Sequence, residues 1–278
     1  MPGKLKAPNF DLAETLDSGQ VFHWSPSEHG GFIGCIGENP VRVEPCDEQL
    51  LVWPTAMKSK ARIYFRLDED HEAVLASFPK KDKALQTSVA FCPGLRIIRQ
   101  PHWECLATFI TSSLKQVAHI RQISLELRRE FGQKHQLDGE ELYSYPTSAA
   151  FVKAGDAKLR KCGVGYRATG LLKTAEKLEN GMRLKDAENL NDKDALEFLC
   201  GFHGVGEKIA NCVLLFGYGR LEAFPIDVWI ERVLRERYFD GAEIARRELE
   251  EFTKSHFGPF GGYAQQYLFH HARKTKLL

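Results

Sequence analysis

Apolar and polar residues alternate in short stretches over roughly the first eighty residues of the chain. Gly, Pro, Asn and Ser turns separate these stretches, and this combination is typical of β-strands. The stretches lie at Val21–Trp24, Gly31–Ile36, Val41–Glu44 and Gln49–Trp53. The pattern predicts an antiparallel sheet in this part of the chain.

Beyond about Asp70 the apolar residues recur at three- and four-residue spacing, the period of an amphipathic helix. Helices are predicted at residues 71–78, Trp103–Ser113, Val117–Phe131, Ala168–Asn180 and Asp192–Cys200. The part from Gly241 to Lys276 is predicted to form two more helices, split at Gly258-Pro259. We therefore expect an α+β protein. An N-terminal antiparallel sheet domain with a flanking helix spans residues 1–98, and a mainly helical domain spans residues 99–278.

Composition narrows the class of protein only slightly. The chain is 43% hydrophobic and 27% charged, which is ordinary for a soluble globular protein. No apolar run reaches membrane-spanning length, and the start MPGKLKAPNFDL lacks a signal-peptide core. The net charge of +1 neither requires nor excludes a nucleic-acid partner. We expect an intracellular protein that does not bind membranes.

The cysteines indicate the redox environment. The seven cysteines include no C-x-x-C pair, and their number is odd. This usage fits a reducing compartment and argues against a disulfide framework.

The candidate chemistry lies between Leu199 and Leu234. This segment is predicted to form a short helix, a tight Gly204-Val205-Gly206 turn and a second helix, a hairpin over residues 196–217. Two helices joined by a Gly-x-Gly turn present unpaired backbone N–H groups and a positive dipole end. Both features suit a DNA phosphate.

Lys208 is predicted in the first turn of the second hairpin helix. The helix dipole disfavours a cation there and so favours the neutral amine, which is the form that attacks carbon. Such an amine can attack the sugar C1′ and form a Schiff base. The alternative is a surface lysine that contacts phosphate.

Asp227 follows Pro225-Ile226 and precedes the helix VWIERVLRERYF. It is predicted to be the N-cap of that helix, with its carboxylate accepting amides of Val228–Ile230. An ionised capping carboxylate could also stabilise the positive charge that grows on the sugar as the glycosidic bond breaks. The structural and the catalytic role are compatible.

The Gly/Pro-rich loop followed by an aspartate resembles the helix-hairpin-helix DNA glycosylases, in which the lysine marks members that also cut the strand. Further similarity points to the 8-oxoguanine DNA glycosylase family and extends over the whole chain. It is carried by Asp17-Ser18-Gly19-Gln20 with Phe22 and Trp24, by Arg99-Gln100, Glu104-Cys105 and Phe109-Ile110, and by FGPFGGYAQQYLF near the end.

The resemblance implies a pocket for the flipped base. The Gly19 carbonyl would accept the N7–H that only the oxidised base carries, and Gln265 would read the Watson–Crick edge. Cys212, four residues after Lys208, would stack against the base, and Phe269 would close the sandwich. From the fragments alone, Gly19 is also consistent with an ordinary turn glycine, and Cys212 and Phe269 with core packing.

The chain departs from the family's well-known vertebrate members on the side of the opposite base. Leu114-Lys115-Gln116 stands where those members have three asparagines, and His119 where they have an arginine that reads the orphaned cytosine. Tyr166-Arg167 matches. Trp229 replaces a histidine that contacts phosphate, although the indole N–H could still donate. The alternatives are a surface histidine for His119 and core packing for Tyr166. We expect relaxed discrimination of the opposite base.

The sequence thus predicts a bifunctional DNA glycosylase and abasic-site lyase for 8-oxoguanine in duplex DNA, acting as a monomer. No cofactor is required, and no metal is held by side chains. The resemblance suggests a sodium or potassium ion on the backbone carbonyls of Cys200, Phe202 and Val205. Two alternatives stay open: a monofunctional alkylated-base glycosylase, and a non-catalytic hairpin module that only grips DNA.

Overall fold

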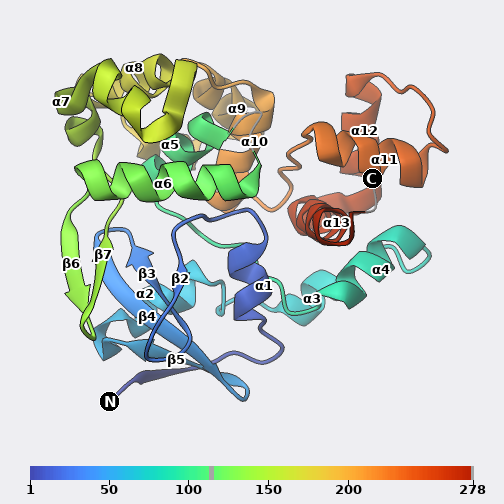
Figure 1. The fold of residues 1–278 in the computed structure, drawn as a ribbon. Coiled ribbons are helices and arrows are strands. Elements are labelled where there is room, and N and C mark those ends of the chain that lie inside the picture. Colours follow the sequence, from blue (N-terminus) through green and yellow to red (C-terminus); the bar gives the residue numbers. More distant parts are fainter. Residues whose placement is uncertain (113–115, 277–278) are drawn as a thin grey trace.

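The computed structural model describes residues 1–112 and 116–276, and within them an antiparallel sheet stands beside a larger helical part (Figure 1). The sheet has five strands in the order β1-β5-β4-β3-β2. Its strands are β1 (Gly3–Lys6), β2 (Ser25–Pro26), β3 (Phe32–Ile36), β4 (Asn39–Cys46) and β5 (Gln49–Trp53). A separate hairpin, β6 (Lys134–Leu137) and β7 (Glu140–Tyr143), lies next to this sheet.

Buried apolar residues at every second position of the central strands form the core of the sheet domain. Val41 and Val43 in β4 and Leu50 and Val52 in β5 are fully buried, and Val43 pairs with Val52. Residues that point to the same face of a pleated sheet share one environment, so these apolar positions collect on one face. They form one cluster with residues such as Trp24, Met57 and Phe65.

A second hydrophobic core lies among the helices from α3 onward. The α-helices of the chain are α1 (Leu12–Asp17), α2 (Lys58–Tyr64), α3 (His71–Ala76), α4 (Lys83–Phe91), α5 (His102–Ser112), α6 (Val117–Phe131), α7 (Ser148–Leu159), α8 (Ala168–Glu179), α9 (Asp192–Cys200), α10 (Glu207–Phe216), α11 (Val228–Tyr238), α12 (Arg246–Phe257) and α13 (Gly261–Thr275). Short helical turns complete the set: η1 (Thr55–Met57), η2 (Arg160–Val164), η3 (Gly165–Arg167), η4 (Leu184–Asn189) and η5 (Gly258–Phe260).

Helix α13 joins distant parts of the chain. Tyr263 and Tyr267 on this helix are fully buried, and the helix packs against α4 and α11. It also lies beside α1, to which it is tied by the Arg273–Asp17 ion pair (Figure 1). The last helix of the chain therefore returns to the loop that follows α1.

The predicted elements are confirmed at most positions. Strands β3, β4 and β5 lie where alternation placed them, and α6 and α9 have the predicted bounds. The two C-terminal helices divide at Gly258. No helix in the described ranges is long and apolar enough to cross a membrane.

One prediction is wrong: Val21–Trp24 is not a strand. Val21, Phe22 and Trp24 are buried, but side chains rather than a strand ladder hold the segment. His23 Nε2 is 2.8 Å from the Cys35 carbonyl, and Trp24 Nε1 donates to the Tyr64 hydroxyl at 3.1 Å. Strand β1 and the β6–β7 hairpin were not predicted.

Candidate active site

The helical hairpin presents an open glycine turn. Helix α9 ends at Cys200 and α10 begins at Glu207, with Gly206 as its N-cap and no side chain capping it. Gly204 has φ +80°, a conformation that favours glycine. No atom lies within 4 Å of where a Cβ would stand at Gly204 or Gly206. The first N–H groups of α10 are therefore accessible to an anion.

Lys208 lies in the first turn of α10, as predicted, and is half-buried. Its ammonium nitrogen is 5.7 Å from the centroid of the Phe109 ring. That ring is stacked on Phe216 with 5.5 Å between the ring centroids, so aromatic residues of α5 and α10 pack together on one side of the lysine.

Asp227 is the N-cap of α11, as predicted. Its Oδ1 accepts the main-chain N–H of Ile230 at 2.8 Å. Within the described part of the chain, Oδ2 accepts no hydrogen bond. One carboxylate oxygen thus fixes the side chain, and the other stays available for a positive charge nearby.

Lys208 and Asp227 both lie close enough to Cys212 to influence its pKa. Burial raises the pKa of the Cys212 thiol to about 11, the charge of Lys208 opposes this rise, and the charge of Asp227 adds to it. Lys208 lies one helical turn before Cys212 on α10. The thiol is therefore neutral near pH 7, and the charges of the lysine and the aspartate shift its pKa in opposite directions.

The residues expected to hold the base gather on α13 and the loop after α1. A Cβ on Gly19 would stand 3.0 Å from Cε1 of Phe269, so the two residues are in direct contact. Gln265 lies one turn before Phe269 on the same face of α13. Gln265 is buried, and its Oε1 has no hydrogen-bond partner among the described residues. An unpaired buried acceptor is costly, so this oxygen fits a ligand donor.

Two phenylalanines pack together beside Lys208. Phe22, three residues after Gly19, packs edge-on against Phe109 at 6.3 Å, and Phe109 lies beneath Lys208. The structure therefore places Lys208 and Cys212 one turn apart on α10 with Asp227 nearby, and it places Gly19 against Phe269 with Gln265 one turn before it on α13.

The remaining predicted residues are exposed. Trp229 is 46% exposed in the first turn of α11, and Tyr166 is 67% exposed. Tyr166 is therefore not a core residue; its ring stacks with the Arg167 guanidinium at 4.3 Å. His119 is exposed near the start of α6. Leu114 lies outside the described residues.

The hairpin carbonyls have the chemistry that a monovalent cation needs, because oxygen donors suit hard cations. The Phe202 carbonyl already accepts the Val205 N–H at 3.2 Å. The Lys177 ammonium donates to the adjacent Gly201 carbonyl at 2.6 Å, so a fixed positive charge stands at this turn.

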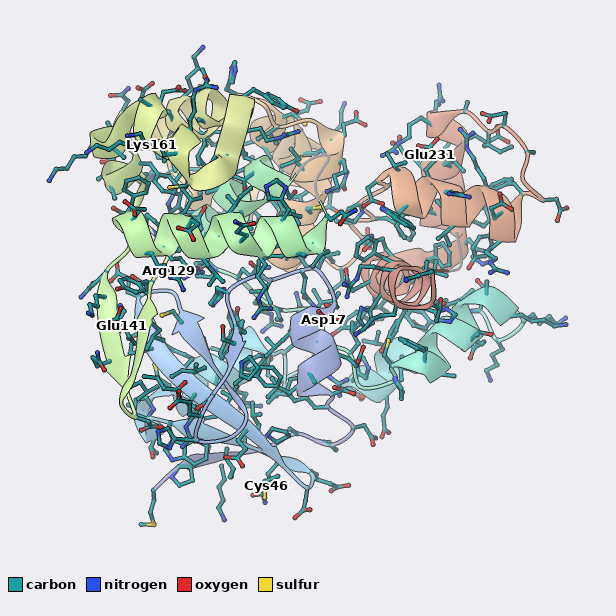
Figure 2. All side chains as sticks on the ribbon, viewed as in Figure 1. Asp17, Cys46, Arg129, Glu141, Lys161 and Glu231 are labelled. Carbon is teal, nitrogen blue, oxygen red and sulfur yellow. The ribbon has the colours of Figure 1, made fainter. Side chains whose placement is uncertain are left out.

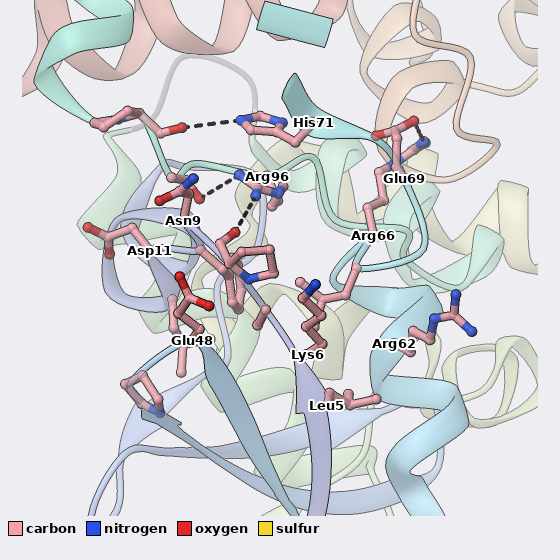
Figure 3. A pocket seen from close by; sticks show the side chains of 18 of the residues that line it. Leu5, Lys6, Asn9, Asp11, Glu48, Arg62, Arg66, Glu69, His71 and Arg96 are labelled. Atoms are coloured by element: carbon pink, nitrogen blue, oxygen red, sulfur yellow. Dashed lines mark hydrogen bonds and ion pairs between the residues drawn. The ribbon is translucent and has the colours of Figure 1, made fainter. Parts of the chain in front are cut away.

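A cavity of about 1030 Å³ lies elsewhere, between the N-terminal strand and α3 (Figure 3). Its lining mixes both signs of charge, including Lys6, Asp11, Arg62 and Glu69. It contains none of the predicted site residues, so it is separate from the cluster around Lys208.

Sequence reasoning assigned no role to two residues at the site. In the sequence Phe109 carries only family similarity, and the position of its ring against Lys208 depends on the fold. Gln266 has no predicted role, although two consecutive glutamines in the otherwise apolar stretch YAQQYLF are a usable signal in the sequence, and both are buried in the structure.

A helical hairpin with a glycine turn, a lysine in its second helix and an aspartate that caps a later helix are the features of helix-hairpin-helix base-excision proteins. Residues 107–259 match the HhH-GPD superfamily base excision DNA repair protein family. Residues 4–106 match the family described as 8-oxoguanine DNA glycosylase, N-terminal domain. The chain belongs to the 8-oxoguanine DNA glycosylase family of this superfamily.

Individual relatives agree with this assignment. The chain is similar to a probable N-glycosylase/DNA lyase of Methanothermobacter thermautotrophicus, with 31% identity over 99% of this chain and 97% of that protein. It is also similar to the 8-oxoguanine glycosylase/lyase of Clostridium acetobutylicum, solved with DNA containing cytosine opposite 8-oxoG. The TM-score is 0.90 at 30% identity, over 99% of this chain and 98% of that one. A 3-methyladenine DNA-glycosylase from Archaeoglobus fulgidus shares the fold, with TM-score 0.82 at 18% identity over 99% of both chains.

Proposed function

We propose that this chain is a bifunctional DNA glycosylase and abasic-site lyase that removes 8-oxoguanine from duplex DNA. The observation that carries the proposal is that Lys208, in the first turn of α10 against the Phe109 ring, and Asp227, the cap of α11, both lie near the buried Cys212. An alkylated-base glycosylase on the same fold would use the aspartate and water and would not need the amine.

The reaction begins at the sugar. The neutral amine of Lys208 attacks C1′ while the bond from C1′ to the base nitrogen breaks, and the departing base takes the bonding electrons and a proton. The Asp227 carboxylate stabilises the positive charge on the sugar during this step. The amine gives one proton to the departing base and the other to O4′. The C1′–O4′ bond breaks in the same sequence, which opens the sugar and leaves an imine between C1′ and the lysine nitrogen. Loss of a C2′ proton expels the 3′ phosphate and nicks the strand.

Recognition uses acceptors that the fold leaves free. The Gly19 carbonyl takes the N7–H of the oxidised base, whereas unoxidised guanine presents a bare acceptor at N7. Gln265 Oε1, which lacks a partner in the described structure, takes a donor from the Watson–Crick edge. Cys212 and Phe269 enclose the two faces of the base.

Extruding the base costs a few kcal/mol of stacking and pairing, which contacts to the DNA must offset. The Gly204–Gly206 turn binds a phosphate through its N–H groups, and Trp229 donates to another. Tyr166, Arg167 and His119 face the orphaned base. Cys200, Phe202 and Val205 would hold a sodium or potassium ion through their carbonyls, which would add positive charge at the turn.

The enzyme works in the compartment that holds the chromosome. All seven cysteines are unpaired, which fits a reducing environment.

Incubation with three matched duplexes tests the function. The duplexes carry 8-oxoguanine, guanine or 3-methyladenine at one position, and both base release and strand cleavage are measured. We expect release and cleavage only with 8-oxoguanine. Release of 3-methyladenine without cleavage would favour the monofunctional alternative, and binding without release would favour a non-catalytic module.

A further inference from the structure

The Gly19 carbonyl is free in a turn whose two flanking residues, Ser18 and Gln20, are hydrogen-bonded to other parts of the fold. Gly19 has φ +85° and is partly exposed, while Ser18 and Gln20 on either side are fully buried. Within the described ranges, no hydrogen bond reaches the Gly19 carbonyl. A peptide between two fixed neighbours keeps its orientation, because turning it over requires rotating them as well.

Helix α13 fixes the upstream neighbour. The Nε2 of Gln266 donates to the Ser18 carbonyl at 2.6 Å, and Gln266 is itself buried. The Ser18 hydroxyl donates to the Thr15 carbonyl at 2.8 Å. The peptide that leads into Gly19 is therefore held by a side chain adjacent in sequence to Gln265.

Two further glutamines fix the downstream neighbour. The Gln20 amide nitrogen donates to the Arg96 carbonyl at 2.7 Å, and its oxygen accepts the Ile98 N–H at 2.6 Å. The Gln100 Nε2 donates to the Gln20 carbonyl at 2.6 Å. The residue after Gly19 is thereby tied to the segment that leads into α5.

The start of the turn is tied to α13 a second time. Asp17 lies at the end of α1, on the side that faces α13 (Figure 2). Arg273 donates to the Asp17 carbonyl, and the Lys274 ammonium is 2.9 Å from the Asp17 carboxylate. Helix α13 thus carries both the base-reading residues and the anchors of the turn.

We propose that Gln266 is a positioning residue for lesion recognition, which aims the Gly19 carbonyl at the base nitrogen that distinguishes 8-oxoguanine from guanine. Gln20 and Gln100 hold the opposite side of the same peptide. The inference rests on the proposed function, in which Gly19 accepts the N7–H. Gln266 does not touch the base; it acts through Ser18.

Replacing the donor tests the inference. Gln266→Met keeps the length of the side chain and removes the hydrogen bond to Ser18. We expect the affinity ratio between 8-oxoguanine and guanine duplexes to fall about three- to tenfold, the loss expected for one misaligned hydrogen bond. Single-turnover excision of 8-oxoguanine should slow similarly. Strand cleavage at a preformed abasic site needs no base and should stay within about twofold of the unmodified protein.

Two further variants complete the experiment. Gln100→Met removes the anchor on the far side of the peptide, without touching α13, and should reduce the same ratio. Tyr267→Phe removes a buried hydroxyl from α13 that donates to the Pro93 carbonyl at 3.2 Å and to the Leu95 carbonyl at 3.4 Å. This hydroxyl makes no hydrogen bond to Ser18, Gly19 or Gln20, so the variant should leave the ratio unchanged. Its melting temperature serves as the reference for general loosening of α13.

The outcomes separate the inference from the proposed function. An unchanged ratio in Gln266→Met and Gln100→Met, with an unmodified protein that excises 8-oxoguanine, overturns the positioning role. Equal loss of excision and abasic-site cleavage, or an equal effect of Tyr267→Phe, also overturns it, because the role would then be structural. An unmodified protein that neither excises nor discriminates contradicts the proposed function itself.

Discussion

The main-chain N–H of Ile230 donates to Oδ1 of Asp227 at 2.8 Å, so a residue proposed for catalysis is also the cap of α11. Asn caps helices about as well as Asp, but it carries no charge. We predict that Asp227→Asn slows single-turnover excision about a hundredfold or more, because the developing positive charge loses its partner. The free energy of unfolding should fall by only about 0.3–1 kcal/mol.

A second capping aspartate provides the control. Asp70 accepts the Ala73 N–H at 3.1 Å at the start of α3, outside the site. Asp70→Asn should cost a similar small amount of stability and leave excision unchanged. Unchanged excision in Asp227→Asn would reduce Asp227 to a structural cap.

A substitution in the glycine turn should weaken DNA binding without lowering the free energy of unfolding. Gly206 is extended at φ −98°, and nothing lies within 4 Å of a Cβ there. Gly206→Ala should therefore change the free energy of unfolding by no more than about 0.5 kcal/mol. Its methyl group would stand where a phosphate approaches, so duplex affinity should fall about tenfold. Gly241→Ala, at φ +77° and outside the hairpin, should lose stability and keep its affinity. The reverse pattern would remove the hairpin from the DNA interface.

Opposite-base preference should respond to one substitution. His119 is exposed at the start of α6, and Arg167 stacks on Tyr166. An arginine offers several donors in fixed geometry to the acceptors of cytosine. His119→Arg should therefore raise the ratio of excision opposite cytosine to excision opposite adenine by about one to two decades. Single-turnover rates on matched duplexes measure the ratio. Arg167→Ala should move it toward equality, and a ratio unaffected by either variant would mean that other residues read the base.

His71 should make stability depend on pH. Burial, aided by the charge of Arg96, lowers the pKa of His71 from 6.5 to about 4. The unfolded chain then binds a proton between these values that the folded chain does not, so stability falls as pH falls through this window. The contribution is fully present above pH 6.5 and falls by up to about 3 kcal/mol toward pH 4.

Denaturant unfolding of His71→Leu isolates this titration from that of the other groups. The variant lacks the contact with the Tyr267 hydroxyl, which is 3.0 Å from His71 Nε2, at every pH. Its stability deficit relative to the unmodified protein should therefore shrink as the pH falls from 7 to 4. A deficit that stays constant would show that His71 titrates alike in the folded and unfolded chains.

Sequence patterns predict correctly those elements whose ends are determined by nearby residues, such as a capping side chain. Helix α9 has an amphipathic period and Asn191 as a capping residue, which accepts the Asp194 N–H at 3.0 Å, and its bounds match. The segment Val21–Trp24 alternates like a strand, yet its burial comes from contacts with other parts of the fold. The β6–β7 hairpin carried a usable signal, the Asp138-Gly139 turn at φ 52° and 84°, that was not used.

The candidate site also combines features set by local sequence with contacts that depend on tertiary packing. Local sequence places Lys208 and Cys212 on one helix face through their four-residue spacing and makes Asp227 the cap of the following helix, whereas the nearness of Asp227 to that pair depends on tertiary packing. Gln266 and Ser18 are 248 positions apart, and no local pattern predicts their hydrogen bond. Neither does local sequence show that Phe109 lies beneath Lys208, since the contact depends on how α5 packs against α10.

The central claim is that Lys208 is the nucleophile, and borohydride trapping on a duplex containing 8-oxoguanine tests it most directly. The unmodified protein should become covalently fixed to the DNA, because reduction converts the imine into a stable amine. Lys208→Gln should bind the lesion but fail to trap, while Lys193→Gln, an exposed change on α9, should trap normally. Trapping by Lys208→Gln at the rate of the unmodified protein would contradict the account.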